Sequence, residues 1–128
     1  KTADLADRTL FLDGVEEDDL INLYNGARVL VLPSYYEGFG LPPLEAMACG
    51  TAVIASDRGS LPEVVGEAGV IVDPDEEGAL AAAMTSVCSD RELRENLEAK
   101  GLTRARNFDW EKTARDTLAV YQDVGRPR

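Results

Sequence analysis

Short apolar runs alternate with amphipathic stretches along the first part of the chain. Val29–Leu32 and Ala52–Ala55 are continuously apolar, which is typical of strands covered on both faces of a parallel sheet. Val70–Val72 repeats this pattern. An earlier apolar run, Thr9–Leu12, stops at an Asp-Gly pair, the kind of sequence at which strands end. The pattern therefore predicts four strands.

Apolar residues at helical spacing fall between and after these runs. The acidic segment Glu16–Asp19 suits the first turn of a helix, and a short helix is expected from about Pro42 to Cys49. Beyond Pro74 the chain lacks turn dipeptides and predicts consecutive helices. These helices are expected at Glu76–Val87, Arg91–Arg106 and Trp110–Val124. Alternating strands and helices imply crossover connections, hence an α/β fold with a parallel, doubly wound sheet and a helical C-terminal tail.

Length and composition narrow the function classes. The chain has 128 residues, 45% of them apolar and 29% charged, as expected for one soluble globular domain. Its formal net charge of -11 disfavours nucleic acid and anionic lipid as partners. The chain has no histidine, so neither a Ser-His-Asp nor a Cys-His arrangement is available. Two distant cysteines and no long apolar run favour a reduced, cytoplasmic location.

Ligands of such sheets bind beyond the carboxyl ends of the strands, and the loop after Leu32 has the features of a ligand site. It places Gly38 and Gly40 between a strand end and a helix start, where backbone amides can hold an anion such as a diphosphate. Pro42 and Pro43 remove two amide donors from the following helix. The remaining donors are Gly38, Phe39, Gly40, Leu41 and Leu44.

Glu37 and Glu45 flank this turn and allow two interpretations. Beside a phosphate site, carboxylates are useful as acceptors from neutral hydroxyls, such as those of a sugar. Alternatively, Glu37 is a solvated loop residue and Glu45 stabilises the helix dipole. The spacing by itself favours the second interpretation.

The longer pattern changes that balance. Glu37–Gly50 reads EGFGLPPLEAMACG and closely resembles the Glu-x7-Glu signature of retaining, group 1 glycosyltransferases of family 4, which have the GT-B fold. The similarity continues through Val53–Ser56 and Gly59–Gly66 to Asp73 and Pro74, in the order of the family's C-terminal, nucleotide-sugar-binding domain. It covers nearly the whole chain, although the terminal helices match in pattern alone. Residues 1–128 are thus expected to form a single, partial domain.

The resemblance implies a role for each matching residue. Glu37 would bind the donor sugar hydroxyls as the catalytic carboxylate, and the backbone from Gly38 through Phe39 and Gly40 to Leu41 would bind sugar and diphosphate. Glu45 would bind the ribose, and Gly14 and Val15 would approach the nucleobase. The implied substrate is a nucleotide-diphosphate sugar, with GDP-mannose preferred over UDP-sugars. Neither a metal nor another cofactor is expected, and the acceptor domain would lie outside this chain. The competing hypothesis is a non-catalytic binding or assembly module.

Two further motifs have ambiguous functions. Asp73-Pro74-Asp75 has the spacing of a metal-binding Asp-x-Asp, but its position between strand and helix favours Asp75 as an N-cap. The segment Gly59–Glu63 either lines the site or forms a plain strand-to-helix turn.

The strand order leads to an expectation about assembly. If Thr9–Leu12 is the third strand of the order 3-2-1-4-5-6, the first two strands are missing from the chain and leave an apolar edge without partners. We therefore expect the chain to form a homo-oligomer.

Overall fold

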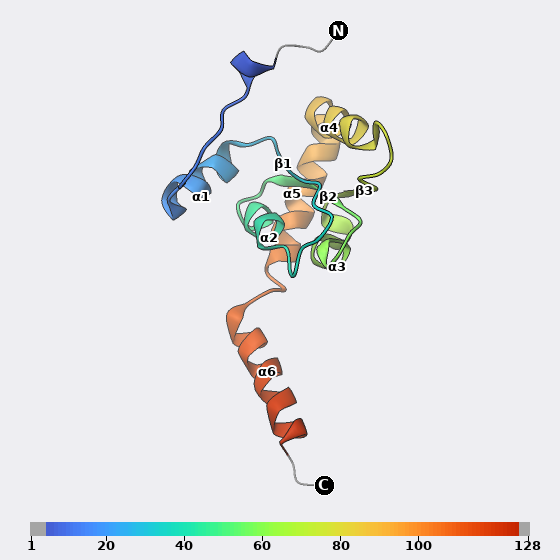
Figure 1. Cartoon of the computed structure of the whole chain (residues 1–128). Helices are drawn as coiled ribbons and strands as arrows, with labels where there is room; N and C mark the ends of the chain where they lie inside the picture. The colour runs from blue at the N-terminus through green and yellow to red at the C-terminus, as the bar shows by residue number, and fades with distance from the viewer. Residues whose placement is uncertain (1–4, 126–128) are drawn as a thin grey trace.

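Three strands and six α-helices make up residues 5–125, the part of the chain that the computed structural model describes (Figure 1). The strands are β1 (Val29–Leu32), β2 (Ala52–Ser56) and β3 (Val70–Val72). The α-helices are α1 (Glu17–Gly26), α2 (Leu41–Ala48), α3 (Leu61–Val65), α4 (Ala79–Ser89), α5 (Arg91–Ala105) and α6 (Trp110–Val124). The structure also has two short 3-10 helices, η1 (Ala6–Arg8) and η2 (Gly66–Ala68).

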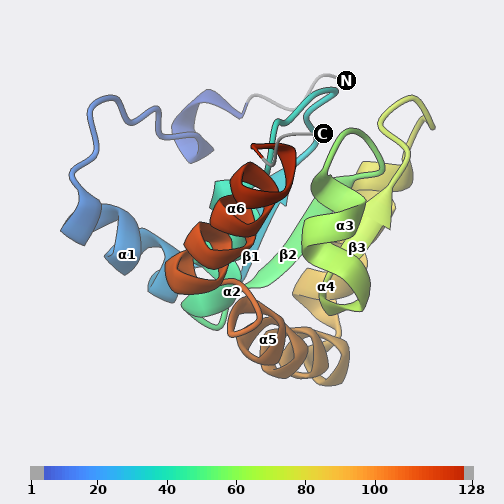
Figure 2. The ribbon, with the colours of Figure 1, turned by 90° about the horizontal axis from the view of Figure 1, so that it is seen from below.

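The sheet is parallel, with strand order β1-β2-β3. Ile54 in the central strand aligns with Val31 on one side and with Val70 on the other. Because α2 and α3 connect strands that run in the same direction, the carboxyl ends of all three strands lie at one edge. Helices cover both faces of the sheet (Figure 2). The predicted α/β, Rossmann-like class is confirmed.

Alternate side chains of β2 enter two separate cores. Val53 and Ala55 pack with residues of α1, α2 and α3, whereas Ala52 and Ile54 pack with residues of α4 and α5. Every residue of β2 is buried, as the unbroken apolar run predicted. Burial of one large aliphatic side chain such as Ile54 contributes about 1.5–3 kcal/mol, so β2 anchors the structure.

The predicted first strand does not form. Thr9–Leu12 makes no sheet, and Leu10 and Phe11 are 80% and 92% exposed. A strand is stable when neighbouring backbone satisfies its N–H and C=O groups, and no such partner lies beside this segment within residues 5–125. The apolar run was correctly located, but apolar residues alone do not make a strand.

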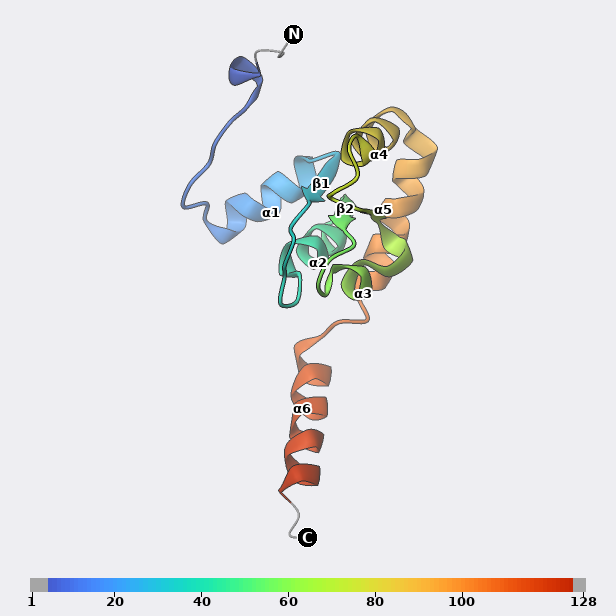
Figure 3. The same ribbon diagram turned by 45° about the vertical axis from the view of Figure 1, so that its right-hand side comes forward.

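The last helices differ in how they pack. α5 lies against α2 and the sheet and buries Leu97 and Gly101, whereas α6 buries no residue and extends from the body (Figures 1 and 3). The helical tail is thus confirmed, although α4 begins at Ala79 and not at Glu76. No helix in the described part of the chain combines the length and apolarity needed to cross a bilayer.

Candidate functional site

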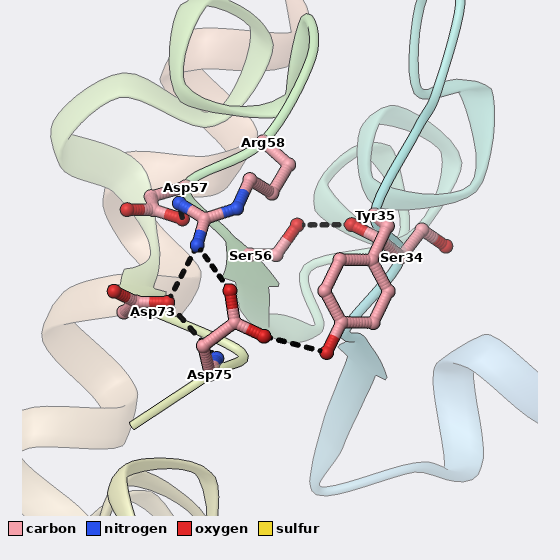
Figure 4. A network of polar contacts seen from close by, with 7 residues as sticks. All are labelled: Ser34, Tyr35, Ser56, Asp57, Arg58, Asp73 and Asp75. Carbon is pink, nitrogen blue, oxygen red and sulfur yellow. Dashed lines mark hydrogen bonds and ion pairs between the residues drawn. The ribbon is translucent and has the colours of Figure 1, made fainter.

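Three loops meet at the carboxyl edge of the sheet. They follow β1, β2 and β3 and comprise residues 33–40, 57–60 and 73–78. The backbone N–H of Asp57 donates to the carbonyl of Val72 at 2.9 Å, which ties the second loop to the end of the third strand. Figure 4 shows the polar contacts that connect all three. This edge is where the sequence predicted a ligand site.

The loop after β1 turns into α2 at Gly40. This residue is buried, has φ +101° and acts as the N-cap without a side-chain hydrogen bond. A Cβ at this position would lie 2.9 Å from Cδ2 of Leu61, so a larger residue would meet both backbone strain and a steric clash. Glycine here therefore sets the direction of the loop that carries the predicted site residues.

Unpaired amides gather at this turn. Within residues 5–125, the backbone N–H groups of Gly38, Phe39, Gly40 and Leu41 donate to no protein acceptor. They lie at the N-terminal end of α2, where the helix dipole favours negative charge. The structure thus brings together the predicted amide donors in a form that suits an anionic group.

Glu37 lies in the same loop, half-buried, beside the turn. Its carboxylate makes no hydrogen bond or ion pair with a described residue, which leaves its acceptor oxygens available. Its main chain, by contrast, is held firmly: the hydroxyl of Ser60 lies 3.0 Å from the Glu37 carbonyl oxygen.

Glu45 lies on α2 and is held from α1. Tyr24 is 8% exposed, and its hydroxyl donates to Oε2 of Glu45 at 3.1 Å. Burial, followed by the hydrogen bond and negative charge of Glu45, raises the pKa of Tyr24 to about 12. The contact leaves acceptor capacity on the second carboxylate oxygen, so Glu45 remains able to bind a hydroxyl.

Arg58 joins the loops after β2 and β3. Its guanidinium contacts Asp57 at 2.5 Å, Asp73 at 2.7 Å and Asp75 at 2.9 Å (Figure 4). Asp75 also accepts from the Tyr35 hydroxyl at 2.9 Å, which extends the network to the loop after β1. The hydrogen bond from Arg58 holds the pKa of Asp75 below its usual range, and the hydrogen bond to Asp75 raises the pKa of Tyr35.

The predicted capping role of Asp75 is wrong. The N-cap of α4 is Gly78, three residues further on, and the Asp75 side chain binds Arg58 and Tyr35 instead. Asp75 lies three residues before the N-cap, and its carboxylate accepts from Arg58 and Tyr35 of the two other loops. The absence of a metal from the function remains a prediction.

An apolar hollow of about 320 Å³ borders the site on the outer side of α2. Phe39, Leu41 and Glu45 form its wall toward the turn, and Phe108 and Trp110 form the wall toward α6. The rings of Phe39 and Phe108 meet edge to face with centroids 6.0 Å apart. The hollow offers apolar contact area next to the Glu45 carboxylate.

Gly14 and Val15 are not part of this assembly. They lie in an exposed segment before α1, which runs along the outside of the molecule (Figures 1 and 3). No hydrogen bond or ion pair connects them to another described residue. Their role toward a nucleobase remains a prediction.

Sequence reasoning missed Tyr24, Tyr35 and Arg58 as site residues. Tyr24 packs in the apolar core beside α2 and the sheet. The hydrogen bond between its hydroxyl and Glu45 could not be predicted from a local sequence pattern, because 21 residues separate the two. The one available indication for Arg58 was its position two residues after the end of a strand.

Comparison with known proteins agrees with the geometry. The family model described as "Glycosyl transferases group 1" matches residues 1–104. Among the similar curated proteins, O-antigen chain mannosyltransferase B of Escherichia coli is 46% identical over 112 residues, which are 88% of this chain and 29% of that protein. D-inositol 3-phosphate glycosyltransferase of Salinispora tropica is 40% identical over 122 residues, 94% of this chain and 25% of that protein.

A solved structure shares the fold. Sucrose-phosphate synthase from Thermosynechococcus elongatus superposes with a TM-score of 0.83 and 38% identity, over 94% of this chain and 31% of that one. The chain thus spans less than a third of the length of each of these relatives.

Proposed function

The chain belongs to the group 1 glycosyl transferases, and we propose that it forms the part of such an enzyme that binds the nucleotide-diphosphate sugar. The observation that carries this proposal is the turn between β1 and α2. It combines unpaired amides at a helix N-terminus with Glu37 before them and Glu45 behind them. Anion donors and hydroxyl acceptors in one place match the two chemical halves of a sugar diphosphate.

Each residue of the turn has a distinct proposed role. The amides of Gly38 to Leu41 hold the diphosphate and neutralise charge as it develops on the leaving group. Glu37 accepts hydrogen bonds from hydroxyls of the transferred sugar. Glu45 accepts from the ribose, and the Tyr24 hydroxyl orients its carboxylate. The free oxygens of both carboxylates support these assignments.

We propose a retaining transfer that needs no metal and no side-chain base. The bond between the anomeric carbon and the β-phosphate oxygen breaks as the acceptor hydroxyl attacks from the same face of the sugar. The hydroxyl proton passes to the departing phosphate oxygen, and the nucleoside diphosphate leaves. A chain without histidine is compatible with this chemistry because the leaving group itself accepts the proton.

The proposed donor sugar is a hexose, with mannose from GDP-mannose as first choice. The support is the name of similar proteins, since O-antigen chain mannosyltransferase B and serotype-specific mannosyltransferase WbdA of Escherichia coli are 46% and 41% identical to the chain. We propose that the acceptor binds a separate domain of a longer enzyme, which is consistent with the small share of each relative that the chain covers.

Titration calorimetry tests the donor site directly. The 128-residue chain and the full-length protein that contains it are titrated with GDP and with UDP. We expect the full-length protein to bind one of the two nucleotides, and GDP more tightly if mannose is the sugar. Failure of both proteins to bind either nucleotide at millimolar concentration would instead support a non-catalytic binding or assembly module.

A further inference from the structure

The loop that carries Glu37 is held from outside at several points. The Ser56 hydroxyl donates to the carbonyl of Ser34, and Asp75 accepts from the Tyr35 hydroxyl (Figure 4). Both contacts lie before Glu37 in the loop. Glu37 itself is approached by Gly59 and Ser60, which belong to the loop after β2.

Ser60 occupies a capping position without acting as a cap. It is the N-cap residue of α3, where serine side chains commonly bind the amides of their own helix, yet it makes no such bond. Its hydroxyl lies instead 3.0 Å from the carbonyl oxygen of Glu37 and 2.6 Å from that of Phe39. The single proton of this hydroxyl is shared between the main-chain carbonyls on the two sides of Gly38.

Gly59 allows this close approach. It has φ +58°, and a Cβ there would lie 2.9 Å from the Glu37 carbonyl oxygen and 3.1 Å from the Glu37 nitrogen. Real Cβ atoms essentially never come within 3.0 Å of a neighbour, and the atom met at 2.9 Å is backbone, so a side chain at position 59 would push the two loops apart. Gly59 and Ser60 together enclose the Glu37 backbone.

This arrangement matters because the hydrogen bond that holds Glu37 itself is made to its main chain. Its carboxylate makes no hydrogen bond or ion pair with a residue between 5 and 125, so a shift of its main chain would displace the carboxylate with no polar contact to resist it. We propose that Ser60 is a positioning residue for the reaction, which acts through the main chain of Glu37 and Phe39. The inference rests on the proposed donor-binding function, in which Glu37 faces the transferred sugar.

Kinetics of the full-length protein test the role of Ser60. Ser60→Ala removes the hydroxyl that holds the turn and should lower kcat by about fivefold. The donor is GDP-mannose, or UDP-glucose if the wild-type protein binds UDP. Affinity for the free nucleoside diphosphate should fall less than kcat does, because this ligand contacts the amides of the turn but lacks the sugar that Glu37 contacts. Ser60→Gly removes the same hydroxyl but, unlike Ser60→Ala, leaves no methyl group in its place. It should give the same result.

A matched control and a double-mutant cycle separate positioning from general stability. Ser89→Ala removes a similar bond, from a serine hydroxyl to the carbonyl of Thr85, on α4, and should leave kcat unchanged. In a Glu37→Gln background, Ser60→Ala should cause no further loss, since the two residues act as one unit.

Three results would overturn the inference. These are an equal loss of kcat in the wild-type and Glu37→Gln backgrounds, an equal loss in Ser89→Ala, or a fall in nucleotide affinity that parallels kcat. Failure of the proposed function is seen separately, because the wild-type protein would then bind neither GDP nor UDP.

Discussion

The carboxylates of Glu37 and Glu45 have different surroundings, although both flank the same turn. Glu37 has no protein donor among the described residues, whereas Glu45 shares the buried hydroxyl of Tyr24. In the proposed function, Glu37 would strengthen its contacts as the sugar reacts, whereas Tyr24 holds Glu45 before any ligand binds.

Substitution to the amide should therefore affect different kinetic parameters. Glu37→Gln in the full-length protein is expected to lower kcat by roughly tenfold to hundredfold, because it would weaken the proposed charge-assisted bond to the sugar. Glu45→Gln is expected to weaken nucleotide binding by about tenfold with a smaller effect on kcat. Steady-state kinetics and calorimetry measure both. Equal and negligible effects of the two substitutions would favour solvated, non-functional glutamates.

Tyr24 gives a prediction for alkaline stability. Its pKa in the folded protein is about 12, above the ordinary value of 10.0, so the folded state favours the neutral phenol. The contribution of the neutral phenol to the free energy of unfolding is complete below pH 10. It is lost as the pH rises toward 12, which lowers the free energy of unfolding by about 2 kcal/mol. Urea unfolding should show that the free energy of unfolding of Tyr24→Phe falls less between pH 10 and pH 12 than that of the wild type.

The control for this experiment is Tyr36→Phe, because Tyr36 is 83% exposed. It should lose stability with pH as the wild type does. A wild-type protein whose free energy of unfolding stays constant from pH 10 to pH 12, after correction for other groups, would contradict the burial of Tyr24 and its hydrogen bond to Glu45.

At the scale of elements, α5 and α6 provide a matched pair of helices with similar caps. Asp90 accepts from the Leu93 amide at 3.0 Å, and Asp109 accepts from the Lys112 amide at 2.6 Å. α5 packs against the sheet, whereas α6 buries no residue. The same substitution should thus have different consequences in the two helices.

We expect Asp90→Ala to lower the free energy of unfolding of the chain by about 1 kcal/mol, because α5 folds together with the core. Asp109→Ala should leave the unfolding midpoint unchanged and lower the helix content of α6, since an isolated helix of this length is marginal. Urea titration followed by circular dichroism and amide exchange measures both effects. Identical midpoints for the two variants would mean that α6 is coupled to the core.

The elements also show how far sequence reasoning reached. Continuous apolar runs located β1, β2 and β3 because strands buried on both faces admit few polar residues. The same reasoning failed at Thr9–Leu12, since strand formation requires hydrogen-bonding partners that a local pattern does not reveal. α4 starts three residues later than expected because Asp75 and its neighbours form contacts with other loops.

The candidate site also has a part that the sequence predicted and a part that it did not. The turn from Glu37 to Leu41 was predictable, because its glycines, prolines and carboxylates are local in sequence. The contacts of Ser60 with Glu37 and of Tyr24 with Glu45 were not, because they join residues 23 and 21 positions apart. Only the packing of α1 and the order of the strands bring these pairs together.

At the scale of the whole molecule, the charge of the chain disfavours binding of a diphosphate. Arg58 is the basic residue at the carboxyl edge, and three aspartates already bind it. With a net charge of -11, the chain should bind a nucleotide sugar weakly. We predict that the 128-residue chain alone transfers no sugar, and that detection of radiolabelled product with any acceptor would refute this.

Exposed apolar surface supports the prediction of self-association. Leu10 and Phe11 project from the segment before α1, while Trp110 and Tyr121 on α6 are 78% and 70% exposed. Light scattering of the purified chain at micromolar concentration should show dimers or larger species. Phe11→Asp should reduce them, whereas Asn96→Asp adds the same charge at another exposed site and should not. A stable monomer with a narrow melting transition would contradict the prediction.

The one-sided pairing of β1 links the proposed site to hydrogen exchange. Within residues 5–125, β1 pairs with β2 alone, so alternate backbone amides along Val29–Leu32 face β2 while the others face away from the sheet. Amides of the second kind lack a strand partner and exchange with solvent first. Because residues 33–40 follow β1 directly, a ligand that orders this loop also restrains the strand. Slower exchange in β1 would then report occupancy of the turn, at backbone positions that the ligand never touches.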